Sequence, residues 1–334
     1  MTKRKRVVFV TKKKLEQVNP KNIQSYESYL RSRIAVNNEV KDTTYKTYRS
    51  YFNQFLVYLL EHWDNVNING KKFRKDAVDI MEGFMYFCQD TLGNNKKVIN
   101  TKISAVSSYF HWAVKRGELK HHPFDGKLER VQGARDEKII AEHYLTQEEV
   151  DTITKALEKR ENGYDIVDQL IWGIMIDSAN RVGAIHSLNI SDLDLEEMKF
   201  DNIREKRGKR VEVVFNNHTA EIIKEWLELR EEMDELKNDA FFVTYYGEKY
   251  RRMSKQRIQE RIKEIGKIIG LDDFRSHSIR KTALNIAFEL TNDLGAVADL
   301  ANHSSVETTQ QSYIRPRSKT EIREKLNKIR REQG

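Results

Sequence analysis

The sequence predicts a mainly helical α+β fold: a helical N-terminal domain, followed by a mixed α/β domain with a small antiparallel sheet. Apolar residues recur at helical spacing through the first third of the chain and through much of its second half. Two short strand-like runs, 200–203 and 210–215, flank a turn that contains Gly208, which is typical of a hairpin. A length of 334 residues accommodates two domains.

A basic arm is predicted for residues 1–21. The first 14 residues hold seven Lys or Arg and no acid. A segment of this kind either contacts DNA phosphates or is a solvated, disordered tail, and both alternatives stay open here. The candidate phosphate contacts in the arm are Lys3, Arg4, Lys5 and Arg6.

Residues 22–125 are predicted to form the helical domain. Asp42 to Thr44 offers an N-cap for one helix, and another helix runs over about 94–116 and stops at Gly117. The aromatic residues follow helical spacing, so we expect them to form the core and not to stack on bases. Cys88, the only cysteine, lies in an apolar run, which indicates a buried and unreactive thiol.

The composition favours a polyanionic partner in a reducing compartment. The net charge is +8, and each neutralised phosphate of a nucleic acid releases counterions; a soluble basic protein without such a partner would carry the same charge. A single cysteine cannot form an internal disulfide. No apolar run approaches the ~20 residues of a membrane span, and the first residues lack the apolar core of a secretory signal. We therefore expect a cytoplasmic protein that does not associate with membranes.

A charged, weakly periodic stretch over 126–143 predicts a linker, and a second domain is expected over 144–318. Thr146 and Glu149 form a capping box for a helix that reaches about residue 159. A buried helix is predicted over 165–178, and a third strand over 240–244. The remaining helices are expected at 217–236, 254–269, 277–290, 293–301 and 306–314. Residues 319–334 predict a basic tail helix with Ile322, Leu326 and Ile329 on one face.

Six side chains in this second domain have the chemistry needed to break a phosphodiester bond. A tyrosine can form a covalent intermediate, and two arginines can hold the oxygens of a phosphate with charge-assisted bonds. Histidines and a lysine can carry protons around the same phosphorus, so neither a metal nor a cofactor is required. The candidates are Arg181, Lys206, His277, Arg280, His303 and Tyr313.

Each candidate also has an ordinary structural interpretation. His277 and Arg280 share one face at the start of a helix, where a phosphate is attracted, but an amphipathic surface helix would show the same pair. Arg181 follows an apolar run, and a charge there needs a partner or a ligand. Lys206 lies in the hairpin turn, where Lys209 is an alternative for the same role.

The order of these residues resembles the tyrosine recombinase (phage integrase) family from about residue 22 to 318. The segment His277-Ser278-Ile279-Arg280, then His303-Ser304-Ser305, then Tyr313, is similar to the family's boxes in order and spacing. The resemblance implies a helical core-binding domain over 22–125 and a tyrosine-recombinase catalytic domain over 144–318.

The resemblance also implies a reaction and partners. Tyr313 would attack the scissile phosphate to give a 3′-phosphotyrosine, with Lys206 giving a proton to the leaving 5′-oxygen. The partner would be double-stranded DNA, with further contacts from Lys46, Lys102 and Lys209. The protein would assemble as a tetrameric synapse through the tail helix.

Four residues depart from the family pattern. Ala179 and Asn180 replace a Gly-Leu pair before Arg181, Ala184 replaces an acid three residues after it, and Asn302 replaces a glycine before His303. The missing acid predicts that Arg181 is held less firmly. These departures keep open a sequence-specific DNA-binding regulator that uses the scaffold without recombining. A relaxing topoisomerase is a further alternative, although it would not need the tail helix.

Overall fold

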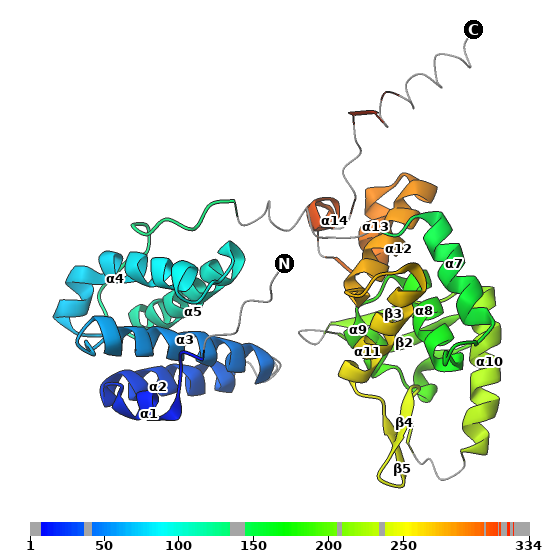
Figure 1. The fold of residues 1–334 in the computed structure, drawn as a ribbon, viewed down its shortest axis with the longest axis horizontal. Helices are drawn as coiled ribbons and strands as arrows, with labels where there is room; N and C mark the ends of the chain where they lie inside the picture. The colour runs from blue at the N-terminus through cyan, green and yellow to red at the C-terminus, as the bar shows by residue number, and fades with distance from the viewer. Residues whose placement is uncertain are drawn as a thin grey trace. The chain divides into compact units, whose positions relative to one another are not determined.

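The computed structural model describes residues 8–36, 42–133, 144–205, 209–233, 238–303, 305–312, 314, 319–320 and 323. The chain divides into two compact units, Met1–Ala141 and Glu142–Gly334, each with its own hydrophobic core (Figure 1).

The first unit is helical, as the hydrophobic spacing predicted. Its core is built largely from aromatic rings: Tyr26 stacks on Phe52 with ring centroids 3.7 Å apart, and Tyr109 meets both rings. These rings are buried, which agrees with a packing role. The helices are α1 (Lys12–Gln17), α2 (Pro20–Val36), α3 (Asp42–His62), α4 (Lys71–Asp90) and α5 (Lys96–Lys115).

The basic arm predicted over 1–21 is folded from Phe9 onward. Phe9 and Val18 are buried in the core of the first unit. Between them, α1 begins at the capping residue Thr11, and Lys14 forms an ion pair with Glu61 at 2.6 Å. Three lysines of the predicted arm therefore belong to a helix. The candidate contacts Lys3, Arg4, Lys5 and Arg6 lie outside the described residues.

Lys102, predicted as a DNA contact, is buried within the first unit, and that prediction is corrected. Its side chain lies on α5, and the residue is only 2 % exposed. The ammonium donates to the side-chain oxygen of Asn94 and lies 3.6 Å from the sulfur of Cys88. Burial lowers the pKa of Lys102 and raises the pKa of the Cys88 thiol to about 11. The thiol is thus buried and protonated, as expected of an unreactive cysteine.

The beginning of the predicted linker, 126–143, is packed on the first unit. Asn100 on α5 exchanges two hydrogen bonds with the backbone of Val131, both 3.0 Å long. Arg130 donates to the carbonyl of Asn100 at 2.9 Å, and Leu128 packs against the core. The first part of the predicted linker, through Val131, therefore belongs to the first unit, and residues 134–143 lie outside the description.

The second unit is organised around α8 (Ile166–Ser178), the buried helix that its apolar sequence predicted. Ten of its residues are buried, and its most extensive helix contacts are with four other helices. Those helices are α7 (Gln147–Glu158), α10 (Asn217–Glu232), α11 (Lys255–Gly266) and α12 (Ser276–Thr291). The predicted capping box of Thr146 and Glu149 starts α7. The chain continues through α13 (Leu294–Leu300) and α14 (Val306–Ser312).

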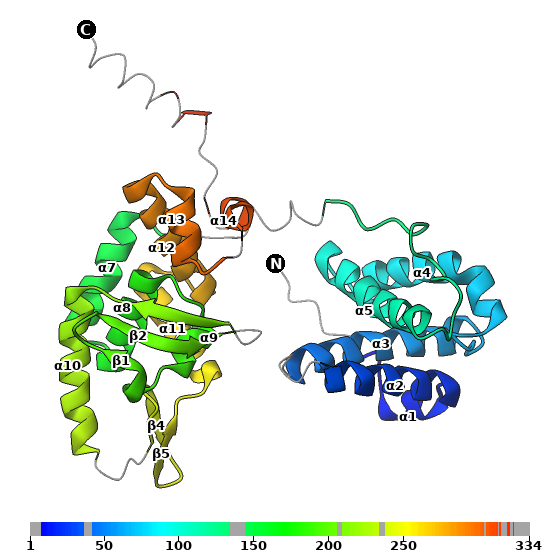
Figure 2. The ribbon, with the colours of Figure 1, turned by 180° about the vertical axis from the view of Figure 1, so that it is seen from behind.

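The predicted hairpin is the centre of a three-stranded antiparallel sheet. The order of strands in the sheet is β1 (Leu193–Asp194), β2 (Lys199–Arg204) and β3 (Arg210–Val214); β3 is labelled in Figure 1, and β1 and β2 in Figure 2. Short α9 (Val182–Ser187) contacts β2, which brings the start of α9 close to the end of the hairpin.

The third predicted strand, 240–244, does not join this sheet. It begins later, as β4 (Val243–Tyr246), and pairs with β5 (Lys249–Arg252), which hydrophobic alternation did not reveal. Gly247 and Glu248 both have positive φ, as a two-residue hairpin turn requires. This second hairpin extends away from the three-stranded sheet (Figures 1 and 2). In the described ranges, no helix combines the length and apolarity that a bilayer crossing needs.

Candidate active site

Arg181 stands at the bend between two helices of the second unit. Helix α8 ends at Ser178, and Ala179 then adopts a left-handed conformation with φ of 52°. The buried side chain of Asn180 secures the bend by donating to the carbonyl of Glu212 at 3.0 Å. The bend makes Arg181 the N-cap of α9, and 39 % of its side chain is exposed.

An acid from the sheet pairs with Arg181. The guanidinium donates from Nη1 to Oε2 of Glu205 at 2.8 Å, and only 3 % of the Glu205 side chain is exposed. We expected Arg181 to be held weakly, because Ala184 replaces an acid on its own helix. That expectation is corrected, since the acid comes from the end of β2. No pattern in the sequence near Arg181 indicates Glu205, because the two residues belong to different elements.

Arg280 is the most deeply buried cation of the site, with 1 % of the residue exposed. From the second turn of α12 it donates to the carbonyl of Ala179 and, at 2.6 Å, to the carbonyl of Ala301. A third contact joins its Nη2 to Nε2 of His303 at 3.0 Å. One guanidinium thus connects the end of α8, the start of α12 and the end of α13.

His303 is a neutral imidazole between Arg280 and Thr309. Because a guanidinium only donates hydrogen bonds, Nε2 of His303 accepts, and its proton is on Nδ1. Nδ1 then donates to the hydroxyl of the buried Thr309 at 2.7 Å. Burial, followed by the positive charges of Arg280, Arg181 and Lys209, lowers the pKa of His303 from 6.5 to about 4. Sequence reasoning missed Thr309.

The hairpin β2–β3 is attached to the site on both sides of its turn. The backbone N–H of Glu205 donates to the carbonyl of Lys209 at 2.7 Å. Lys209 donates from Nζ to the carbonyl of Asn302 at 2.8 Å. Asn302 has φ of 55°, a conformation that glycine and asparagine tolerate best. Glu205, before the turn, therefore holds Arg181, and Lys209, after the turn, holds the segment before His303.

A sequence profile of the phage integrase family matches residues 143–320, just over half of the chain. The chain belongs to the phage integrase family. It is 25 % identical over 290 residues to tyrosine recombinase XerC of Mannheimia succiniciproducens, covering 86 % of this chain and 90 % of that protein. It is 28 % identical to tyrosine recombinase XerC of Corynebacterium glutamicum, over 65 % of this chain and 68 % of that protein.

Solved structures share the fold. The XerH site-specific recombinase in a post-cleavage complex with difH substrate has a TM-score of 0.65 and 18 % identity, covering 83 % of this chain and 76 % of that one. A λ integrase dimer bound to a core site has a TM-score of 0.61 and 13 % identity, covering 89 % and 96 %. At these identities the likeness establishes a mainly helical fold with small antiparallel sheets, as the sequence predicted.

In this family member the structure brings four charged or polar candidates together: Arg181, Arg280, His303 and Lys209. His277 lies on the first turn of α12, one turn before Arg280, and its side chain is exposed. Lys206 and Tyr313 lie outside the described residues; α14 ends at Ser312, directly before Tyr313. Lys46 is exposed on α3, in the first unit.

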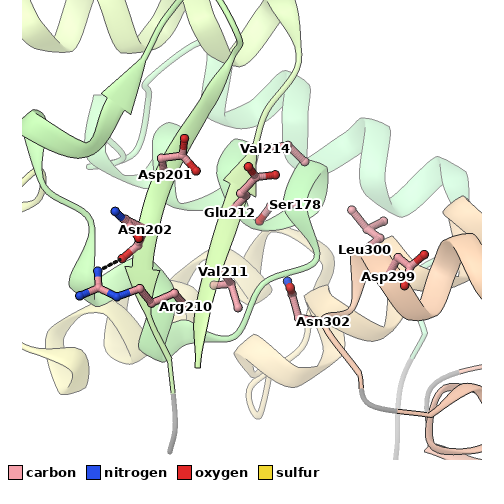
Figure 3. Close-up of a pocket in the computed structure, with 10 residues that line it drawn as sticks. All are labelled: Ser178, Asp201, Asn202, Arg210, Val211, Glu212, Val214, Asp299, Leu300 and Asn302. Atoms are coloured by element: carbon pink, nitrogen blue, oxygen red, sulfur yellow. Dashed lines mark hydrogen bonds between the residues drawn. The ribbon is translucent and has the colours of Figure 1, made fainter. Parts of the chain in front are cut away.

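A pocket of about 370 Å³ lies beside the site, between the sheet and the end of α13 (Figure 3). Asp201 and Glu212 on the strands and Asp299 on α13 contribute carboxylates to its lining. This charge disfavours a phosphate, so we place no DNA in it. Within the described ranges, no group of three or more acidic, His or Cys side chains is arranged to hold a metal ion.

Proposed function

We propose that this tyrosine recombinase cuts and rejoins duplex DNA at a specific site through a 3′-phosphotyrosine intermediate. The observation that carries the proposal is the convergence of three cations: Arg280 bonds to His303, Lys209 bonds to the carbonyl of Asn302 next to it, and Arg181 pairs with Glu205, which itself bonds to Lys209. Three cations from separate elements around one neutral imidazole form a site suited to a phosphate. Tyr313, the proposed nucleophile, is the next residue in sequence after α14, and Thr309 of α14 contacts that imidazole.

In the proposed reaction, Oη of Tyr313 bonds to the scissile phosphorus while the bond from phosphorus to the 5′-oxygen breaks. The tyrosine proton passes to a base, for which His277 is the candidate because both nitrogens of His303 are engaged. Lys206 gives a proton to the 5′-oxygen. A 5′-hydroxyl of another strand then attacks the phosphotyrosine and restores Tyr313. The bond energy is retained, so no nucleotide cofactor is consumed.

Arg181 and Arg280 would stabilise the charge that develops on the phosphate. Arg181 keeps an exposed face, so it can reach the phosphate directly. Arg280 is preorganised by two carbonyls and by His303. We therefore assign His303 the task of holding Arg280, in place of the expected task of carrying a proton at the phosphorus.

The proposed partner is double-stranded DNA, and the proposed assembly is a tetrameric synapse. Solved relatives include a λ integrase tetramer bound to a Holliday junction, which has a TM-score of 0.57 to this chain. Residues 22–125 would bind DNA as the core-binding domain, and residues 144–318 would catalyse. The tail, 319–334, would link protomers, and the protein would act in the cytoplasm.

A covalent-trapping experiment tests this function. The protein first selects its binding site from randomised duplexes, and that site is then rebuilt with a nick that lets the 5′-fragment diffuse away. Wild type should form a denaturation-resistant adduct with this DNA, and Tyr313→Phe should form none while binding equally well. Arg280→Ala should lose most of the rate, because an oxyanion-hole donor is worth about 3–4 kcal/mol.

Tyr245→Phe is the matched control. Tyr245 is exposed on β4, away from the site, so this variant should form the adduct at the wild-type rate. Equal adduct from Tyr313→Phe would show that another nucleophile acts.

A DNA-binding regulator without recombinase activity is the second candidate. The observation in its favour is the carboxylate of Glu205, which offsets the positive charge of Arg181 within the site. A regulator would bind the selected site tightly and yield no adduct at any protein concentration. The trapping experiment therefore separates the two functions.

A further inference from the structure

We infer that Glu205 is the positioning residue for Arg181, in place of an acid on the arginine's own helix. The inference deepens the proposed function and rests on it. It assigns a part in DNA cleavage to a residue that precedes the predicted catalytic turn and that does not itself touch the phosphate.

The two partners of this ion pair differ sharply in exposure. The Glu205 side chain is 3 % exposed, whereas that of Arg181 is 39 % exposed. A buried carboxylate is costly unless it is paired, so Glu205 stays against its partner while the outer face of the guanidinium remains open. Only Nη1 bonds to Glu205, and a guanidinium has five N–H donors. The remaining donors can therefore engage a phosphate without breaking the pair.

Nothing on helix α9 replaces this restraint. Arg181 is the N-cap of α9 without a side-chain capping bond, and Ala184 is fully buried with no charge to offer. Among the residues that the structure describes, Glu205 is the acid within ion-pair distance of Arg181. Oε1 of Glu205 is buried and has no hydrogen-bond partner in that part of the chain, so the bond from Arg181 to Oε2 is the side-chain contact that compensates the buried carboxylate there.

The position of Glu205 also connects Arg181 to the hairpin turn. Its backbone N–H donates to the carbonyl of Lys209, which closes the turn, and the next residue in sequence is Lys206. A single residue thus pairs with the arginine proposed to bind the phosphate and hydrogen-bonds across the base of the turn, next in sequence to the proposed proton donor. An acid at position 184 would hold only the arginine and would have no link to the hairpin turn.

The test compares two scissile groups on the same nicked site. One is the ordinary phosphate; in the other, a methyl group replaces a non-bridging oxygen and removes the negative charge that Arg181 neutralises. Glu205→Gln keeps the side-chain shape and removes its charge. We expect it to slow adduct formation on phosphate by about 10- to 100-fold, by analogy with loss of the residue that supports a metal ligand, and to change the rate on the uncharged group far less.

Glu212→Gln is the matched control. Glu212 lies on the adjacent strand, is 57 % exposed and pairs with Lys199 at 3.1 Å, so its loss should leave both rates unchanged. Melting temperature and affinity for the uncut site report whether each variant is folded. Should Glu205→Gln be unfolded, Glu205→Asp, which keeps the charge but withdraws it by one methylene, is used for the same comparison.

Each result has a definite meaning. A loss confined to the charged phosphate supports positioning of Arg181. An equal loss on both groups would reduce Glu205 to a structural residue, and faster cleavage by Glu205→Gln would make the carboxylate an inhibitor; both overturn the inference while the proposed function stands. Absence of any adduct with wild type removes the proposed function, and the inference with it.

Discussion

At the scale of single residues, the key hydrogen-bonding groups of the site already have partners within the protein before DNA binds. Three hydrogen-bond acceptors hold Arg280, and both ring nitrogens of His303 have partners. Such groups cost little to reorganise when charge develops on a phosphate, which is the basis of electrostatic preorganisation. Arg181, with its exposed face, is the residue left to respond to the substrate.

The protonation of His303 should make the protein sensitive to acid. The folded protein depresses its pKa from 6.5 to about 4, so between those values the unfolded chain binds more protons than the folded one. The stability that comes from the neutral imidazole is therefore present above pH 6.5 and is lost as the pH falls toward 4. We expect the melting temperature of wild type to drop more between pH 7 and pH 5 than that of His303→Gln. Equal drops would show that other groups cause the acid sensitivity.

The sequence predicted residues whose role follows from local patterns, and it missed those whose role depends on contacts between elements. The buried aromatic rings and the Thr146–Glu149 capping box follow from helical spacing and short motifs. Glu205 and Thr309 act on residues of other elements, which a linear pattern does not reveal. Lys102 was misassigned because lysine is usually exposed. Here the ammonium is buried and has polar partners in the side-chain oxygen of Asn94 and the sulfur of Cys88.

At the scale of elements, the hairpin β2–β3 is the part that the reaction would use most. Its register is interrupted between Phe200 and Ile203, which marks an irregularity in β2 shortly before the turn. The strands were predicted almost to the residue, because alternating apolar residues face one core. The hairpin β4–β5 was missed in part, because its second strand is Lys249–Arg252, a charged segment with little burial.

The choice between Lys206 and Lys209 as the proton donor is testable on this hairpin. A substrate whose 5′-bridging oxygen is sulfur has a better leaving group and needs no general acid. Lys206→Ala should be slow on ordinary DNA and close to wild type on the sulfur substrate. Lys209→Ala should be slow on both, because Lys209 holds the segment before His303 through Asn302. Rescue of Lys209→Ala alone would reverse the assignment.

At the scale of the whole molecule, the net charge of +8 should dominate DNA binding. Affinity should fall by about 10³-fold or more between 50 and 200 mM salt if six or more phosphates are contacted. Lys46→Ala, on exposed α3, should reduce the salt slope by about 1. Lys102→Met removes a buried charge and should leave the slope unchanged. A nearly flat salt dependence of wild type would contradict binding through phosphates.

The division into two units was foreseeable in outline, because the composition changes near residue 126. The position of the change was misleading, since Arg130 hydrogen-bonds to Asn100 and Ser104 on α5. Charge and weak periodicity suggest a linker, but they do not report the backbone hydrogen bonds that Asn100 provides.

The entry of the chain into the second unit has a practical consequence. The backbone N–H of Leu145 donates to the hydroxyl of Thr282 at 2.9 Å, and that hydroxyl donates to the carbonyl of Ser278. The ammonium of Lys281 lies 5.4 Å from the centre of the Tyr144 ring. A separately expressed second unit should therefore start upstream of Tyr144. A fragment that starts at the first helical residue, Gln147, would lack the contacts of Tyr144 and Leu145 with Lys281 and Thr282, the two residues that follow Arg280. We expect it to fold poorly for reasons unrelated to catalysis.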